Sequence, residues 1–504
     1  MKRMQLLTGI MAVGLTLGPV ISARACTTVL VGKDASQDGS TLIARNEDVD
    51  TAWAKHFVVH PATSNGPTEY ISKDNGFKVT VPGAGLRYTA TPDWQQKDGQ
   101  DQFSEDGINS ANVAMSATES GTTNKKAQKA DPFVKDGIAE TSMVDVVLPY
   151  IHSAKEGVEY LGKIVEEKGS AENNGVIFSD KNSIWYMEIG SGHTWAAVRV
   201  PNDKYAVIAN QTSIGTLKLN DHANYLASPG LAKFVKRHYL AQVTQNRVNY
   251  AQAFGTNNKL DATYNWPRVW DGQRLLTPSK KQSIKQHDLA LFMKPDQKIS
   301  VATVQRVLAS HFNGTKYDSN GKWVGGYRPI NVPTDVESHI LQIRNDVPAE
   351  IAGVQWLAMA SPATSVYVPF YTNVNTTPHQ YQSGTDQPDQ SSAYWTYKLT
   401  RVLTDPYRNK LINKDVRPAQ KKLNHQLQVN LKQSDQTAQQ LTGSALSDYL
   451  AQQNQQNANL AQNTFEKLNQ KLIVDSSRQT KLSITKIFKL TLGFQLSDDP
   501  LTSY

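Results

Sequence analysis

The sequence predicts a mixed α+β fold in which sheets stack on one another and are covered by helices. Three observations lead to this prediction. Four short runs within 175–209, rich in β-branched and aromatic residues, are separated by turn signals. Two helical patterns follow one another over 140–169, the second with a capping box at its start and a glycine at its end. From residue 393 onward Gln and Asn increase, Gly and Pro become rarer, and helical periodicity takes over.

The chain divides into three predicted segments. Residues 1–25 combine two basic residues, an apolar stretch and a closing Ala-Arg-Ala, which is the pattern of a secretory signal peptide. This segment is too short and wrongly flanked for a stable membrane span. We therefore expect an exported protein, secreted or associated with the cell surface. Residues 26–392 form the predicted catalytic domain, and 393–504 a helical C-terminal region.

Composition excludes several function classes. The net charge of +8 is modest for 504 residues, and the basic residues are scattered, so we expect no nucleic-acid partner. The sequence has no H-E-x-x-H, no paired cysteines, no G-x-S-x-G and no Gly-rich phosphate loop. It therefore predicts no metal and no cofactor, and it supports neither a zinc peptidase nor a serine hydrolase.

Cys26 is the only cysteine, and it follows the Ala-Arg-Ala end directly. Cleavage after Ala25 would place it at the N-terminus of the mature chain. An N-terminal cysteine is a self-contained catalytic pair, because its thiol is a nucleophile and its α-amino group, with a pKa of about 7.7–8.0, is a base. We expect a precursor that keeps the preceding residue to be inert, because acylation of the amine removes the base.

Cys26 opens a predicted β-hairpin. Residues 27–32 and 40–46 are both β-prone, and Asp-Gly lies between them. A turn centred near 36–37 returns Arg45 and Asp48 to the level of Cys26. The guanidinium of Arg45 would then stabilise the thiolate, and Asp48 would hold the protonated amine.

Two other interpretations of Cys26 stay open at this point. A lone cysteine is commonly a small buried apolar residue. Alternatively, Cys26 is the lipid attachment point of a surface binding protein, although Ala23 and Arg24 fit the usual lipidation motif poorly.

The run from Cys26 to Asp48, Cys-Thr-Thr-x-Leu-Val-Gly-Lys onward to Ile-Ala-Arg-Asn-Glu-Asp, resembles the dipeptidases of lactic acid bacteria. These are cysteine-type N-terminal nucleophile hydrolases, related to choloylglycine hydrolases and penicillin V acylases. The resemblance extends to about Tyr407. It implies an αββα four-layer sandwich and hydrolysis of short peptides with broad specificity through a thioester. An acylase or conjugated bile acid hydrolase with the same machinery is the alternative.

Four further site residues rest on this resemblance. An asparagine after a strand can donate to an oxyanion, and the resemblance implies that role for Asn210, which otherwise is a turn residue. Arg268 would lie near the nucleophile, unless it only packs on the neighbouring tryptophans. Thr118 would line the substrate pocket and His193 would touch substrate, with a sheet residue and an exposed turn residue as the respective alternatives.

The C-terminal region carries amphipathic stripes without recognisable chemistry. One stripe is Leu423, Leu427 and Leu431, and a second includes Phe465 and Leu468. We expect these helices to pack on the catalytic domain or on a second subunit, which leaves a homo-oligomer open.

Overall fold

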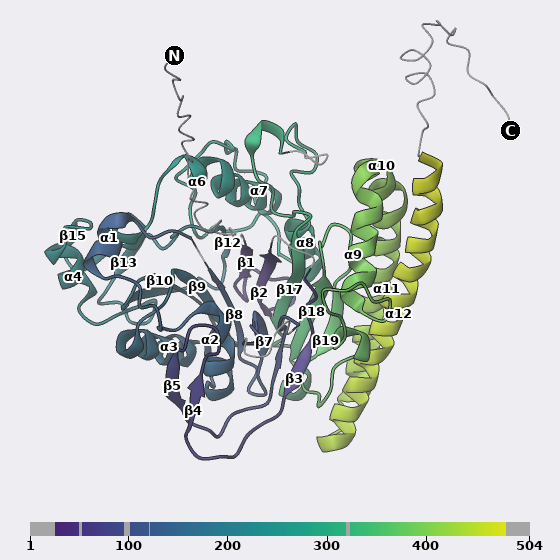
Figure 1. Cartoon of the computed structure of the whole chain (residues 1–504), viewed down its shortest axis with the longest axis horizontal. Coiled ribbons are helices and arrows are strands. Elements are labelled where there is room, and N and C mark those ends of the chain that lie inside the picture. Colours follow the sequence, from purple (N-terminus) through teal and green to yellow (C-terminus); the bar gives the residue numbers. More distant parts are fainter. Residues whose placement is uncertain (1–25, 50–52, 95–100, 120, 319–322, 480–504) are drawn as a thin grey trace, which may run out of the picture.

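The computed structural model describes residues 26–49, 53–94, 101–119, 121–318 and 323–479. The expected signal segment 1–25 lies outside them. The chain forms a mixed α/β structure with several sheets and a helical C-terminal region, as the sequence predicted. Two six-stranded antiparallel sheets make up its centre (Figure 1).

The first sheet has the strand order β12-β1-β2-β17-β18-β19. Its strands are β12 (Tyr205–Ile208), β1 (Thr27–Val31), β2 (Thr41–Asp48), β17 (Asp335–Ile343), β18 (Gly353–Met359) and β19 (Val368–Tyr371). The second sheet has the order β14-β11-β10-β9-β8-β7. Its strands are β14 (Tyr225–Ala227), β11 (Thr194–Arg199), β10 (Ile184–Ser191), β9 (Asn174–Ser179), β8 (Ala114–Glu119) and β7 (Asp106–Ile108).

Smaller sheets and the helices complete the described chain. The small sheets are β3 (Val58–His60) with β6 (Tyr88–Ala90), β4 (Thr68–Ile71) with β5 (Lys78–Val81), and β13 (Thr216–Lys218), β16 (Arg247–Asn249) and β15 (Val243–Thr244). The helices are α1 (Lys125–Ala130), α2 (Glu140–Val147), α3 (Ala154–Lys168), α4 (Leu231–Arg237), α5 (Tyr250–Phe254), α6 (Lys259–Tyr264), α7 (Trp266–Leu276), α8 (Val301–Leu308), α9 (Ala393–Thr404), α10 (Arg408–Leu411), α11 (Arg417–Ala438) and α12 (Gly443–Gln479). Among the described residues, no helix combines the length and apolar character that crossing a membrane requires.

The hairpin at the start of the described chain has the predicted register. Thr27 lies opposite Asn46 and Thr28 opposite Arg45, so the turn is centred between residues 36 and 37. Because side chains alternate along a strand, Cys26, Thr28 and Leu30 share the face of β1 that points to the second sheet. Leu30 packs there in one core cluster with Ile43, Ile177 and Tyr186.

The sequence pattern over 175–209 suggested one continuous meander, and this prediction is wrong for its last strand. β9, β10 and β11 are neighbours in the second sheet, but β12 pairs with β1 in the first sheet. The far side of β11 is occupied by β14, so β12 has no place beside it. This change of sheet brings the residue after β12 close to the beginning of β1.

Helices cover the outer faces of the two sheets. α2 and α3 pack on the second sheet through a core that includes Val144, Leu161 and Trp195. α3 approaches closely because two of its residues are glycines: a Cβ at Gly157 would lie 2.4 Å from the Phe178 ring, and one at Gly162 would lie 2.4 Å from the Trp195 ring. Residues of α7 and α8 pack on the outer face of the first sheet.

The C-terminal helices α9, α11 and α12 stand together along one side of the molecule, beside β19 (Figure 1). Their predicted apolar stripes are buried: Leu423 and Leu427 of α11 join Phe465 and Leu468 of α12 in one core cluster with β18 and β19. Asn454 of α12 closes the edge of the sheet, because its amide accepts from the Tyr371 N–H and donates to the Tyr371 carbonyl, both at 2.9 Å. A side chain thus takes the place of a further strand.

Candidate active site

Cys26 lies between the two sheets at the beginning of β1, and only 5% of its surface is exposed. Nη1 of Arg45 donates to its Sγ at 3.1 Å. Arg45 itself is fully buried on the adjacent strand, where the hairpin register places it on the same face as Cys26. The one thiol of the chain therefore faces a fixed cation.

Glu105 and Ser116 hold the Arg45 guanidinium in place. Nη2 donates to Oε2 of Glu105 at 2.6 Å, and Nε donates to Oγ of Ser116 on β8 at 2.9 Å. Burial opposes the charge of Arg45, but Glu105 and the other anionic groups nearby together outweigh it and raise the pKa of Arg45 well above its usual value. All three kinds of guanidinium nitrogen thus have a partner, which fixes the direction of the Nη1–H bond toward sulfur.

The environment of Cys26 favours the neutral thiol. Burial raises the pKa of Cys26 to about 12, and the opposing effect of Arg45 is smaller. Arg45 acts in the expected direction, because it favours the thiolate, but the desolvation of the sulfur outweighs one neighbouring cation. A reaction at this sulfur needs a base that takes the proton as the bond forms.

Arg268 of α7 contacts Cys26 from the other side. Its Nη1 donates to the Cys26 carbonyl oxygen at 2.7 Å, and its Nη2 donates to Oδ1 of Asn210 at 2.8 Å and to Oδ1 of Asn265 at 2.7 Å. Burial and the neighbouring Arg328 lower the pKa of Arg268 to about 9, so it is still a cation at neutral pH. Arg268 contacts main-chain oxygen, not sulfur, and thereby links the start of β1 to the residue after β12.

Asn210 is held from three directions. Its Nδ2 donates to the carbonyl of Glu119 at the end of β8, its Oδ1 accepts from Arg268, and its own carbonyl accepts from Nδ2 of Asn265 at 2.9 Å. The change of sheet by β12 places Asn210 here. Cys26, Arg45, Asn210 and Arg268, which are predicted site residues, thus form one connected cluster.

Asp48 lies at the end of β2 and forms a buried ion pair with Arg328. Burial and the neighbouring Asp48 raise the pKa of Asp335, which lies beside this pair, well above its usual range. The carboxyl group of Asp335 also forms a hydrogen bond with Asp48, which contributes to the raised pKa of Asp335. One carboxylate oxygen of Asp48 is therefore engaged by an arginine that sequence reasoning did not single out.

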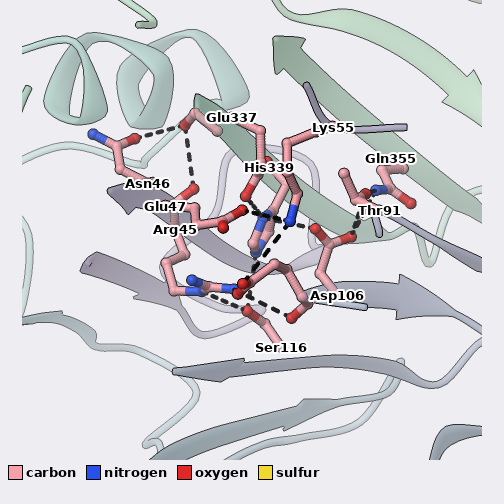
Figure 2. Close-up of polar contacts among 12 residues, drawn as sticks. Arg45, Asn46, Glu47, Lys55, Thr91, Asp106, Ser116, Glu337, His339 and Gln355 are labelled. Atoms are coloured by element: carbon pink, nitrogen blue, oxygen red, sulfur yellow. Dashed lines mark hydrogen bonds and ion pairs between the residues drawn. The ribbon is translucent and has the colours of Figure 1, made fainter. Parts of the chain in front are cut away.

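A charged cluster fills the space between the sheets beyond Arg45 (Figure 2). Nζ of Lys55 lies 3.0 Å from Oε2 of Glu47, 2.6 Å from Oδ1 of Asp93 and 3.9 Å from Oε1 of Glu105. The Lys55 side chain is fully buried. Lys55 thus compensates the carboxylate that orients Arg45 and two further carboxylates.

His339 of β17 continues this network. Its Nδ1 lies 2.9 Å from Asp106 Oδ2 and 2.9 Å from Glu337 Oε1, and its Nε2 lies 3.0 Å from Ser116 Oγ (Figure 2). Burial acts to lower the pKa of His339, but the two carboxylates outweigh it and raise it to about 9. Ligand atoms of Asp106, Glu337 and His339 lie within 4.8 Å of one another, as in a metal site. An imidazolium that hydrogen-bonds Glu337 and forms an ion pair with Asp106 accounts for the same two distances.

Of the two residues predicted to contact substrate, Thr118 lies beside Asn210, because Oγ1 of Thr118 and Nδ2 of Asn210 both donate to the Glu119 carbonyl. Thr118 is buried near the end of β8, on the same face of the strand as Ser116. His193 lies in the turn between β10 and β11, where its Nδ1 is 2.9 Å from Oδ1 of Asp131. The roles of Thr118 and His193 toward a substrate stay predictions.

Sequence reasoning missed the residues that support the cluster. These are Glu47, Lys55, Glu105, Ser116, Asn265, Arg328 and His339. Glu47 and Asn265 stand beside residues that were singled out, so their position in the sequence was a usable signal. The others are single polar residues in unrelated segments, and the sequence carries no signal for them.

Glu188 of β10 gives the site a measurable pH dependence. Its carboxylate accepts from the Ser213 N–H at 2.6 Å, from the Ile214 N–H at 3.1 Å and from Tyr186 Oη at 3.0 Å, so it holds the loop that follows Asn210. Burial raises the pKa of Glu188 from 4.5 to about 7. When folding raises the pKa of an acidic group, the free energy of unfolding falls as the pH rises from the pKa of that group in the unfolded state to its pKa in the folded state.

We therefore expect the stability of the wild type, relative to Glu188→Gln, to fall by up to about 3 kcal/mol between pH 4.5 and 7. Urea unfolding of both proteins across this pH range measures the difference. Glu159→Gln, at an exposed site on α3, is the matched control and should show little pH-dependent difference. A Glu188→Gln difference that does not change with pH would contradict the assignment.

Comparison with known proteins places this cluster in context. The sequence model of peptidase family C69 matches residues 25–422. The match begins directly before Cys26 and ends within α11, so it includes every residue of the cluster described above.

Similar curated proteins carry the name dipeptidase. The chain is 44% identical over 392 residues to a probable dipeptidase of Latilactobacillus sakei, covering 77% of this chain and 82% of that protein. It is 37% identical over 463 residues to dipeptidase A of Lactobacillus helveticus, covering 88% of this chain and 95% of that protein. It is also 37% identical over 415 residues to a dipeptidase of Bifidobacterium longum, covering 76% and 77% of the two chains.

Proposed function

The chain belongs to peptidase family C69, and on that premise we propose that it is a cysteine-type dipeptidase whose nucleophile is Cys26 at the N-terminus of the mature chain. We also propose that it has the αββα fold of N-terminal nucleophile hydrolases. Two stacked sheets with helices on their outer faces support this. The observation that carries the functional proposal is the buried Cys26 thiol at the start of β1, 3.1 Å from Nη1 of Arg45.

The high pKa of the thiol supports a mechanism in which deprotonation accompanies attack. The α-amino group of the mature Cys26 takes the thiol proton while Sγ attacks the carbonyl carbon of the scissile bond. Arg45 stabilises the negative charge that develops on sulfur as the proton leaves. The protonated amine can then lie near Asp48, whose negative charge acts on Cys26.

The tetrahedral intermediate carries its charge on the former carbonyl oxygen. Asn210, which three neighbours hold in place, is the proposed side-chain donor to that oxygen, and Arg268 fixes its orientation. Collapse of the intermediate breaks the C–N bond, and the ammonium returns its proton to the leaving amine. A thioester remains on Cys26, and water activated by the same amine hydrolyses it and restores the thiol.

Broad specificity and export are part of the same proposal. Similar proteins named dipeptidase support action on dipeptides, and acceptance of varied side chains is a further part of the proposal. The signal-like residues 1–25 support secretion or surface association, with cleavage after Ala25 as the step that exposes the amine.

The test compares two proteins. The first begins at Cys26, and the second retains Ala25 because its cleavage site has been blocked by mutation. Intact mass verifies the N-terminus of each. We expect the first to hydrolyse a panel of unblocked dipeptides and the second to be inactive. Preferential cleavage of a phenoxyacetyl amide or a bile acid conjugate would instead indicate the acylase alternative. Equal activity of both chains would overturn the role of the amine, and a lipid on Cys26 would indicate a surface anchor.

A further inference from the structure

A cleft of about 1030 Å³ separates the body of the molecule from the first part of α11. Its walls come from the ends of α7 and α8, the segment 309–314, the segment 362–367 and one face of α11. α8 covers the outer face of the first sheet, whereas Cys26 lies on the inner face. The cleft is therefore distinct from the candidate active site.

Within the described ranges, the cleft lining contains basic side chains and no Asp or Glu. The basic residues are Arg274, Arg306, His311, Arg417, Lys421 and His425. Two of them have acidic partners outside the lining: Arg274 pairs with Asp271 and His311 with Asp318. Arg306, Arg417 and Lys421 form no ion pair within the described part of the chain, so their charges are left uncompensated there.

The basic residues of α11 that line the cleft lie on one face of the helix. Arg417, Lys421 and His425 are spaced by four residues, so they lie on one face of the helix along about 12 Å of its axis. Arg306 of α8 lies in the facing wall. Like charges at this spacing repel one another. Their concentration in a concave site produces a positive potential that attracts anions.

The walls are held in place by contacts that do not use these cations. Nε2 of Gln420 donates to the carbonyls of Ala363 at 3.3 Å and Ser365 at 2.5 Å, which ties α11 to the opposite wall. Oγ of Ser310 donates to Oδ2 of Asp271 at 2.6 Å. Amide side chains that can donate hydrogen bonds complete the lining: Gln305, Asn313, Asn424 and Gln428.

We propose that this cleft binds a linear anion that carries several phosphate groups. Arginine forks and lysine ammonium groups are the usual protein partners of phosphate. Each phosphate brings more charge and more acceptor oxygens than a carboxylate, which suits a wall that offers a cation and an amide donor on successive turns. The length of the α11 row indicates a ligand with two or more phosphates, because one phosphate reaches only part of the row.

The experiment measures binding of sodium tripolyphosphate to the mature full chain by titration calorimetry. We expect binding that weakens with added salt and is tighter than that of orthophosphate. Lys421→Gln should weaken it by about tenfold, the effect of one charge-assisted hydrogen bond. Lys422→Gln is the matched control, because it makes the same change at the next exposed residue of α11, outside the cleft lining.

Dipeptide hydrolysis without tripolyphosphate should be the same in both variants, because neither residue contacts the Cys26 cluster. No binding by the wild type, or equal weakening by both variants, would overturn the proposal. Tighter binding of a poly-glutamate peptide than of tripolyphosphate would replace the phosphate ligand by an acidic peptide.

Discussion

Replacement of Cys26 by alanine is expected to reduce kcat/KM for dipeptides by at least about 10⁴-fold, as removal of a nucleophile does in other covalent hydrolases. The chain contains no other cysteine. Arg45, Asn210 and Arg268 remain in place in the variant, but without sulfur they have no nucleophile to assist. The measurement is steady-state hydrolysis of one unblocked dipeptide by the mature protein.

A folding control is needed because Cys26 is buried. Alanine removes only the sulfur and keeps the Cys26 carbonyl that accepts from Arg268, so we expect a loss of stability of about 1 kcal/mol. A thermal melt of each protein verifies this. Iodoacetamide should modify the wild type once and the variant not at all, with loss of activity in step with modification. A folded Cys26→Ala variant that retains activity would show that the nucleophile lies elsewhere.

The part of the site that the sequence predicted is the part that depends on local geometry. Cys26 and Arg45 belong to one hairpin, and strand alternation with a short turn is enough to bring them together. The roles of Asn210 and Arg268 came from resemblance alone. Their contact depends on β12 leaving one sheet for the other, which periodicity does not encode.

The supporting network was missed for a related physical reason. Arg45 and Glu105 are 60 residues apart, Ser116 and His339 are 223 apart, and Asp48 and Arg328 are 280 apart. A buried polar residue is recognisable only when its partner is known, because its type alone predicts exposure. The apolar stripes of the C-terminal helices could be predicted, because the helical period of apolar residues is visible in the sequence itself. Leu423, Leu427 and Phe465 were therefore predicted to lie on buried faces without knowledge of what they pack against.

Replacement of Lys55 by methionine is expected to lower the free energy of unfolding by about 3–5 kcal/mol at neutral pH, as for removal of one partner from a buried ion pair. The Lys55 side chain is fully buried and compensates Glu47, Asp93 and, at longer range, Glu105. Methionine fills similar space but leaves these carboxylates close together without a cation. Denaturant unfolding of both proteins measures the loss. Lys163→Met, whose side chain is 71% exposed in α3, should change stability by less than about 1 kcal/mol.

The pH dependence of this loss separates the electrostatic cause from a packing defect. In the wild type, burial and Glu105 already raise the pKa of Glu47 well above its usual value, and Lys55 opposes that rise. Without Lys55 the folded-state pKa of Glu47 rises further, so the variant keeps the Glu47 proton over a pH range in which the folded wild type has already lost it. The deficit of Lys55→Met should therefore be small near pH 4.5, where Glu47 is protonated in both folded proteins, and grow once the pH exceeds the raised wild-type pKa of Glu47. A methionine that merely fits badly would cost the same at every pH, and that result would refute the view that Lys55 acts through its charge.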